Sequence, residues 1–390
     1  MKKNIFFLFI MICVQHIPAQ SFQKIHDNAI LVDTHNDILT QVMEHGVVFD
    51  QDLRGKTHSD LTRWKQGGLD VQLFSVWCDG DQKDPFAFAI RQIDTLDAIV
   101  KRNPDKIVEV ANSLAMINTV KSHKIAAMFG VEGGHMMEND LAKLDELYKR
   151  GTRYMTLTWN NSTPWATSAF DETFSKNLQH KGLTDFGKKI VLHMNQLGMM
   201  VDISHVGETT FWDVIHTTAK PVIASHSAVY NLCHHQRNLK DYQIKAIAKN
   251  GGVIQVNFYS GFIDSNFTKR KAAFLERHKA QIDSLYQSGK NEFMVESEIF
   301  SDYKEETDAI RAPLAVLIQH IEYIIKLVGV DYVGLGSDFD GMESPPQQLD
   351  DVTTYPLITK ALLEKGYSKK DVAKILGGNF LRVLKANEAK

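Results

Sequence analysis

The stretch MMVDISHVGETTFWDVIHTTAKPVIASHS, residues 199–227, contains the pattern that decides the fold. Two short apolar runs, Met199–Ile203 and Pro221–Ser225, lead into His205 and His226, and a longer amphipathic segment separates the runs. Short apolar runs that alternate with amphipathic segments are typical of strands buried on both faces by helices. The stretch therefore predicts part of a parallel β/α sheet.

The chain repeats this pattern eight times, which indicates a closed barrel. Segments such as Asp84–Arg102 and Thr184–Leu197 have the apolar spacing of helices. Eight repeats without an early Gly-x-Gly-x-x-Gly loop favour an α/β fold, the (β/α)8 or TIM barrel, over a doubly wound nucleotide-binding sheet. The glycines at 130, 133 and 134 come nearest to such a loop, but their spacing is wrong. The eight expected strands are Ala29–Asp33, Leu69–Trp77, Ile125–Val131, Tyr154–Thr158, Met199–Ile203, Pro221–Ser225, Gly252–Asn257 and Tyr332–Gly336.

Length and composition fit one large globular domain. The chain has 390 residues, of which 44% are hydrophobic and 23% charged, so disorder is excluded. At roughly 150 residues per domain this length suggests two or three domains, yet one barrel often holds a comparable length. We expect a single domain over residues 21–390, with the charged stretch Ser260–Ala312 forming a helical insertion over the barrel mouth after the seventh strand. The net charge of −3, without a cluster of Lys and Arg, argues against nucleic-acid binding.

The N-terminus has the layout of a secretory signal. Lys2 and Lys3 precede the apolar run Ile5–Val14, which is too short to span a bilayer comfortably, and Pro18–Gln20 follows. We expect residues 1–20 to be a cleaved signal peptide and the mature protein to be periplasmic or secreted, with an uncleaved anchor as the alternative. The polar end Leu384–Lys390 predicts no lipid anchor, so we expect no stable membrane anchor.

The mature chain would keep two cysteines, Cys78 and Cys233. Two cysteines far apart in sequence are compatible with one disulfide or with two buried thiols, and we expect buried thiols.

Side chains with metal-binding groups follow four of the expected strands. They are His35 and Asp37, Glu132, His205, and His226. Because the carboxyl ends of all barrel strands open on one face, we expect these groups to converge there. Imidazole nitrogen and carboxylate oxygen suit Zn²⁺, Mn²⁺ or Fe²⁺. Five ligands exceed what one catalytic zinc usually takes, whereas two metals that share Glu132 as a bridge would use them all.

Two carboxylates at the end of the eighth strand have different predicted roles. Asp338 is a candidate catalytic residue, because it could take a proton from metal-bound water and deliver it to a leaving amine. Asp340 is followed by Gly341, a turn pattern, and we assign it turn support.

Six segments of the chain, in the same order, resemble the membrane dipeptidase (renal dipeptidase) family of zinc peptidases. The resemblance implies a (β/α)8 barrel with two zinc ions that hydrolyses dipeptides and, in some members, the opened-ring amide of β-lactam-type compounds. It implies that His35 and Asp37 bind one zinc ion. His205 and His226 would bind the other, with Glu132 between the two ions. The segments are Val32–Asp37, Gly130–His135, Asp202–His205, Ala224–Ser227, Arg237–Asn238 and Gly336–Gly341.

The resemblance also implies roles in substrate binding. Arg237 would bind the C-terminal carboxylate of the substrate, to which its planar fork is suited, and Asp338 would handle the proton of the bridging water. Without the resemblance to this family, we would interpret Arg237 as a surface residue or as the partner of Asp241 in an ion pair. Tyr259 is a further candidate for substrate binding.

One position departs from the family pattern. Many members carry a histidine after the fourth strand that contacts the developing oxyanion, and Trp159 occupies that position here. An indole donates one hydrogen bond and carries no positive charge. Either Trp159 or Asn160 supplies a neutral donor, or the metals alone stabilise the oxyanion. The alternative is that Trp159 and Trp165 are apolar packing at the barrel rim.

These observations support one main functional hypothesis and two alternatives. We expect a zinc metallo-dipeptidase in which a hydroxide held between two Zn²⁺ ions attacks the peptide carbonyl of a dipeptide. The first alternative is an amidohydrolase with the same metal centre that acts on N-acyl amino acids or lactones. The second is an inactive binding homologue, suggested by Trp159. The sequence leaves the number of subunits open, a homodimer included.

Overall fold

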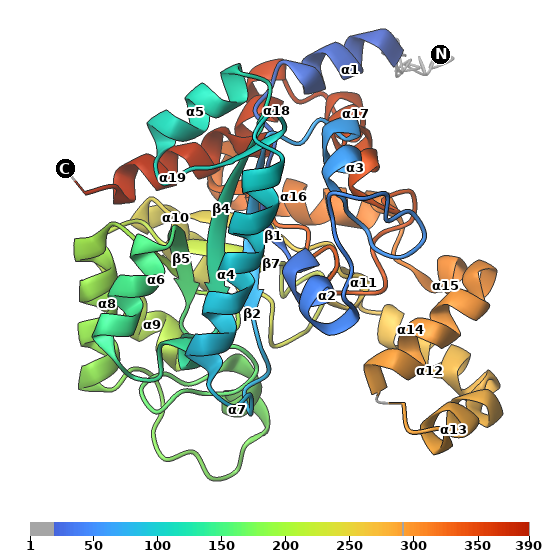
Figure 1. The fold of residues 1–390 in the computed structure, drawn as a ribbon, viewed down its shortest axis with the longest axis horizontal. Helices are drawn as coiled ribbons and strands as arrows, with labels where there is room; N and C mark the ends of the chain where they lie inside the picture. Colours follow the sequence, from blue (N-terminus) through green and yellow to red (C-terminus); the bar gives the residue numbers. More distant parts are fainter. Residues whose placement is uncertain (1–18, 291, 390) are drawn as a thin grey trace, which may run out of the picture.

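The computed structural model describes residues 19–290 and 292–389 (Figure 1). The predicted signal peptide at 1–20 lies outside the described residues except for its last two positions. Within the described chain, no helix has both the length and the apolarity of a membrane span.

A ring of eight parallel strands forms the centre of the molecule. The strands are hydrogen-bonded in the order β1-β2-β4-β5-β6-β7-β8-β9. A parallel bridge between Asn36 and Phe339 joins the carboxyl end of β1 to the segment after β9. The predicted (β/α)8 barrel is thus confirmed. The bounds of the ring strands are β1 Val32–Asn36, β2 Val71–Trp77, β4 Ile125–Glu132, β5 Thr152–Thr156, β6 Met200–Asp202, β7 Ile223–Ser227, β8 Val253–Val256 and β9 Val333–Leu335.

A ninth strand, β3 (Ile107–Glu109), was not predicted. It pairs with β4 outside the ring order. Only Ile107 of its three residues is buried, so its sequence lacks the continuous apolar run by which the other strands are recognised.

The strand ends differ from the prediction at the residues that carry chemistry. The first strand was expected at Ala29–Asp33, whereas β1 continues to Asn36 and so includes His35. β7 likewise runs through His226 to Ser227. These polar residues belong to fully buried strands because their side chains have hydrogen-bond partners. The Asp33 carboxylate, for example, accepts bonds from the Tyr355 hydroxyl at 2.6 Å and the Ser337 hydroxyl at 2.7 Å.

Helices cover the outside of the ring (Figure 1). The predicted helix at Asp84–Arg102 is α4, in which Asp84 is the residue before the first turn. In the predicted helix at Thr184–Leu197, which is α8, the Thr184 hydroxyl caps the first turn by accepting from the Gly187 N–H. The α-helices that come before the eighth strand of the chain, β8, are α1 Ala19–Asp27, α2 Ile38–His45, α3 Leu61–Gln66, α4 Pro85–Arg102, α5 Ser113–Lys121, α6 Leu141–Lys149, α7 Ala169–Phe174, α8 Asp185–Leu197, α9 Glu208–Thr217 and α10 Asp241–Asn250. The α-helices that follow the insertion after β8 are α16 Leu314–Val328, α17 Pro356–Glu364, α18 Lys369–Ala373 and α19 Asn379–Asn387.

The helical insertion follows β8, the seventh strand of the ring, as predicted. It consists of α11 Ser260–Ile263, α12 Phe267–Arg277, α13 Lys279–Gln287, α14 Glu292–Asp302 and α15 Lys304–Ile310. Figure 1 shows α12 to α15 projecting from one side of the barrel, and they have a small core of their own around Phe274 and Ile299. A cavity of about 930 Å³ separates the insertion from the barrel, and Phe300 on one side and Asp340 on the other line it.

Candidate metal centre

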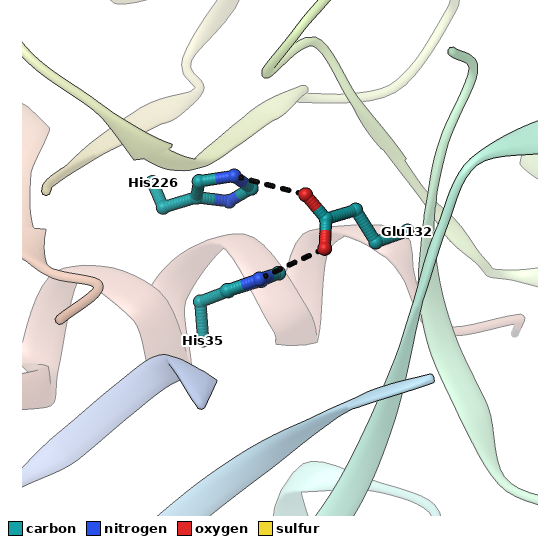
Figure 2. Close-up of side chains that lie close together, drawn as sticks. All are labelled: His35, Glu132 and His226. Carbon is teal, nitrogen blue, oxygen red and sulfur yellow. Dashed lines mark ion pairs between the residues drawn. The ribbon is translucent and has the colours of Figure 1, made fainter. Parts of the chain in front are cut away.

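The structure brings the five predicted metal ligands together at the carboxyl end of the ring. Figure 2 shows the rings of His35 and His226 one above the other and Glu132 beside them, with one carboxylate oxygen toward each ring. Oε2 of Glu132 lies 3.2 Å from Nε2 of His35, while Oε1 lies 2.8 Å from Nε2 of His205 and 3.4 Å from Nε2 of His226. Asp37 approaches from β1, with Oδ2 3.4 Å from Nε2 of His35. The two carboxylate oxygens of Glu132 thus face different groups of ligands, the arrangement that a bridging carboxylate requires.

Each histidine is fixed through its other ring nitrogen. Nδ1 of His35 lies 2.9 Å from the Tyr154 hydroxyl, which itself donates to the carbonyl of Thr34. Because that hydroxyl hydrogen is already used, the Tyr154 oxygen accepts the proton of Nδ1. Nε2 of His35 then carries the lone pair that a metal needs.

His226 is held in the same way by Ser225. The Ser225 hydroxyl donates to the Asp202 carboxylate at 2.6 Å and lies 2.8 Å from Nδ1 of His226, from which it accepts. Asp202 is fully buried and also accepts from the Ser225 N–H at 2.9 Å and the Thr156 hydroxyl at 2.5 Å. This chain of bonds leaves the lone pair on Nε2 of His226, which lies 3.0 Å from Nε2 of His205.

His205 has an amide as its partner. Its Nδ1 lies 3.2 Å from Oδ1 of Asn160, an acceptor, so its Nε2 also carries the lone pair. All three imidazoles therefore turn the same nitrogen toward Glu132.

The residues present fit a metal ion. Nε2 of His35 is buried and has no hydrogen-bond partner among the described residues. Among the residues that the structure describes, two groups of side chains have ligand atoms close enough to share an ion, and both include His35. One group adds Glu132 and His226, and the other adds Asp37 and Asp338. Nitrogen and oxygen donors of this kind suit zinc and neighbouring transition metals.

The local charges also favour a cation. Burial, together with the positive Arg237, lowers the pKa of His205 to about 3, so this imidazole is neutral as a ligand must be. Burial opposes ionisation of Glu132, but His35, His205 and His226 outweigh it and hold the pKa of Glu132 well below its usual value. Burial opposes protonation of His35, but Tyr154, Asp37 and Glu132 outweigh it and raise the pKa of His35 well above its usual value. The site thus combines two neutral imidazoles, His205 and His226, with an ionised carboxylate.

Two residues of the site have a backbone conformation that is rare for non-glycine residues. His205 has φ 63° and Asp338 has φ 66°. Hydrogen bonds hold both, since the Ala169 N–H donates to the His205 carbonyl at 2.7 Å and the Asp338 N–H donates to the His35 carbonyl at 3.1 Å. Such strain costs about 1–3 kcal/mol per residue and tends to collect at functional sites.

Asp338 lies at the edge of the metal centre. Its Oδ1 is 3.9 Å from Nε2 of His35, and its Oδ2 accepts from the Asn257 side chain at 2.8 Å. Burial, with the negative Asp37 and Glu132 nearby, raises the pKa of Asp338 to about 7. A carboxyl group of this pKa can both take and give a proton near neutral pH.

The carboxylate of Asp340 bonds to groups outside its own turn, which differs from the predicted turn support. Its carboxylate accepts bonds from the Ser59 hydroxyl and from the His58 N–H, the latter at 2.6 Å. It thereby ties the loop before α3 to the segment after β9. Gly341 follows because a Cβ there would lie 2.3 Å from Oδ2 of Asp37.

Arg237 is buried beside the metal centre with most of its donors unused. It is 5% exposed, and its Nη2 donates to the His226 carbonyl at 3.2 Å. Its Nε and Nη1 have no hydrogen-bond partner among the described residues. Asp241, the alternative ion-pair partner, instead accepts from Asn231 and Tyr323. Unused buried donors of a guanidinium are suited to a carboxylate ligand.

The remaining substrate-binding candidates have different surroundings. Asn160 holds His205, while Trp159 is half-buried and its ring lies near those of Trp77 and His205. Trp165, by contrast, is 1% exposed and belongs to the core. Tyr259 packs edge-on against Phe262, with ring centroids 4.9 Å apart.

A cavity of about 840 Å³ begins at His205 and Arg237. It continues between α9 and the segment before α10, where Tyr230 and Leu239 line it.

The sequence reasoning missed the residues that hold the ligands. Tyr154 and Asp202 were counted only as strand residues. The serines beside His205 and His226 were interpreted as hydrogen-bonding residues at strand ends, and Ser225 does form such bonds. A signal for Tyr154 was present in Gly130, since a Cβ at that position would lie 1.9 Å from the Tyr154 ring. The two cysteines, Cys78 and Cys233, are buried and free, as predicted.

Comparisons with known proteins agree with this geometry. A model of the family described as membrane dipeptidase (peptidase family M19) matches residues 19–390. The chain belongs to this family. The predicted resemblance is thereby confirmed, and metallo-dipeptidase, the enzyme class we predicted, is the class of the family.

Individual relatives show how far the similarity extends. The chain is 35% identical over 394 residues to an uncharacterised dipeptidase of Schizosaccharomyces pombe, covering 96% of this chain and 84% of that protein. It is 31% identical over 366 residues to dipeptidase 3 of Mus musculus, covering 92% of this chain and 64% of the mouse protein.

Solved structures share the fold at lower identity. The probable dipeptidase PvdM from Pseudomonas aeruginosa has a TM-score of 0.76 at 24% identity, over 94% of this chain and 98% of that one. A metallopeptidase from Rhodobacter sphaeroides, liganded with a phosphinate mimic of the dipeptide L-Ala-D-Ala, has a TM-score of 0.74 at 21% identity, over 93% of this chain and 100% of that one.

Proposed function

We propose that this protein is a zinc-dependent dipeptidase with two Zn²⁺ ions per chain. His35 and Asp37 would hold one ion, His205 and His226 the other, and Glu132 both. The observation that carries the proposal is Arg237, which is buried, donates through Nη2 to the His226 carbonyl, and has no partner for Nε and Nη1 among the described residues. A dipeptide differs from an internal peptide segment by the free carboxylate close to its scissile bond, and Arg237 would bind that carboxylate.

Three residues of the chain would have separate roles in the proposed reaction. Arg237 would bind and orient the substrate, and Glu132 would be a ligand of both cations. Asp338 would take a proton from the attacking water and deliver it to the departing nitrogen. Asn257 keeps Asp338 oriented through its bond to Oδ2. The bound zinc ions would polarise the scissile carbonyl and lower the pKa of the attacking water.

The proposal also includes the mature form of the protein and its location. The mature chain would be residues 21–390, released by removal of the signal peptide into the periplasm or the medium. Its substrates would be small dipeptides.

Variants of Arg237 test the proposal. Arg237→Lys keeps the positive charge but loses the planar fork, and Arg237→Met loses both. We expect kcat/KM for dipeptides to fall in the order wild type, Lys, Met, with zinc content unchanged. Substrates with an amidated C-terminus should be poor for the wild type and unaffected by either change. Equal cleavage of free and amidated dipeptides by the wild type would contradict the proposal, and cleavage of N-acyl amino acids or lactones alone would favour the amidohydrolase alternative.

A further inference from the structure

Trp77 and Trp159 form an aromatic pair beside the metal centre. Trp77 is the last residue of β2 and is in register with Glu132 of β4, while Trp159 follows β5. The two indole centroids are 5.0 Å apart, with planes inclined at 69°. The Trp159 ring lies 6.4 Å from that of His205. Both side chains are only half-buried, so the pair presents apolar surface next to the predicted ligands.

The pair rests on a fixed backbone. The Gln92 side chain donates to the carbonyl of Trp77 at 2.7 Å and accepts from its N–H at 3.3 Å. Trp159 precedes Asn160, whose amide holds His205. Two aromatic rings held in this way form a rigid surface, which is what selection by shape requires.

The order of the strands places Trp77 across the mouth from Arg237, while Trp159, after the fourth ring strand β5, lies between the two along the ring. In the ring of eight, β2 is the second strand and β7 the sixth, so they lie on opposite sides. Trp77 ends β2, and Arg237 lies in the segment after β7. Trp77 is in register with Glu132, at the predicted ligands. A dipeptide with its carboxylate at Arg237 and its amide bond at these ligands would extend its N-terminal residue toward Trp77, against which Trp159 packs.

We propose that Trp77 and Trp159 bind the side chain of the substrate's N-terminal residue and select dipeptides with a large apolar or aromatic residue at that position. The inference rests on the proposed dipeptidase function and names its substrate class. Aromatic side chains gain from edge-to-face and offset contacts with indole beyond the gain from burial alone. A glycine at the same position makes no such contact.

The test compares two dipeptides that share a C-terminal residue, Phe-Ala and Gly-Ala. We expect the wild type to prefer Phe-Ala. Trp77→Ala and Trp159→Ala should each lower the ratio of kcat/KM for the two substrates by about tenfold, mainly through KM for Phe-Ala. Trp77→Phe and Trp159→Phe should keep most of the preference. Tyr286→Ala, which removes an exposed aromatic side chain from α13, serves as the control and should leave the ratio unchanged.

Zinc content and thermal midpoint, measured on every variant, show whether the metal centre is intact. An equal fall in kcat/KM for both dipeptides, with zinc retained, would mean that the pair does not select the N-terminal residue, and the inference would be wrong while the dipeptidase function stood. Improved cleavage of Phe-Ala by the alanine variants would mean that the indoles exclude large side chains, which also overturns it. Failure of the wild type to cleave any dipeptide would overturn the proposed function and this inference together.

Discussion

The Tyr154 hydroxyl lies 2.9 Å from Nδ1 of His35, and this contact determines which nitrogen of His35 faces Glu132. The phenol is fully buried and donates its own hydrogen to the Thr34 carbonyl. Tyr154, in the wall of the barrel, thus leaves the lone pair of His35 on Nε2, the nitrogen that could bind a metal ion.

Removal of this hydroxyl should weaken zinc binding. In Tyr154→Phe the ring still fills its space, but Nδ1 of His35 loses its acceptor. We expect zinc affinity to fall by roughly 10- to 100-fold, the usual effect of removing such a supporting contact. Competition with a chromogenic chelator measures it. Tyr323→Phe, which removes a hydroxyl bonded to Asp241 far from the mouth, is the control. Equal affinity in both variants would show that Tyr154 does not support the site.

A methyl group added at Gly130 should destabilise the barrel. The new Cβ would lie 1.9 Å from the Tyr154 ring, and Tyr154 is enclosed on every side. We expect Gly130→Ala to lower the free energy of unfolding by about 1–3 kcal/mol, the usual cost of overpacking a core. Because Tyr154 must shift, zinc affinity should fall as well. Urea unfolding of the zinc-free protein separates the two effects, and an unchanged unfolding midpoint there would contradict the predicted clash.

Asp338→Asn should affect catalysis more than metal binding. An amide cannot take a proton from water at neutral pH, while its oxygen can still accept the bond from Asn257. We expect kcat to fall by about 10²- to 10⁴-fold, the range for loss of a general acid–base. Zinc analysis of the same sample should give the wild-type content. A variant that loses zinc together with activity would instead identify Asp338 as a ligand, for which its place near His35 and Asp37 also qualifies it.

A carboxyl group far from the site allows a test of pH dependence. Burial raises the pKa of Asp70 to about 6, although the hydrogen bond that its carboxylate accepts from the Leu31 N–H acts to lower the pKa. Between pH 4 and 6 the folded state therefore binds more protons than the unfolded state, and stability falls as the pH rises through that window.

Asp70→Asn should remove this dependence, because the amide oxygen can accept the same bond without a charge. We expect the variant to match the wild type below about pH 4 and to be more stable by about 2 kcal/mol at pH 7. The difference between their urea midpoints at several pH values measures the effect. A difference that does not vary with pH would rule out the predicted protonation of Asp70.

The sequence was sufficient to predict the ring of strands and the group of histidines and carboxylates at its mouth, because both follow from local patterns. Apolar runs mark the buried strands, and the residue directly after a run lies at the open end of a parallel barrel. His35, Glu132 and His226 were found in this way.

The supporting contacts could not be predicted in the same way. The bond from Tyr154 to His35 joins residues 119 positions apart, and it depends on how two strands are staggered in the ring. Asp202 and Ser225 belong to apolar runs, where hydropathy treats them only as interruptions. The short strand β3 was missed because only one of its three residues is buried, so it lacks a continuous apolar run.

The most direct measurement of the central claim is zinc analysis of the purified mature chain combined with a dipeptide assay before and after chelation. We predict two zinc ions per chain, cleavage of dipeptides with a free C-terminal carboxylate, loss of activity with a chelator, and its return on addition of Zn²⁺. Full dipeptidase activity in protein free of bound metal, or a fully zinc-loaded protein that cleaves no dipeptide, would contradict the account.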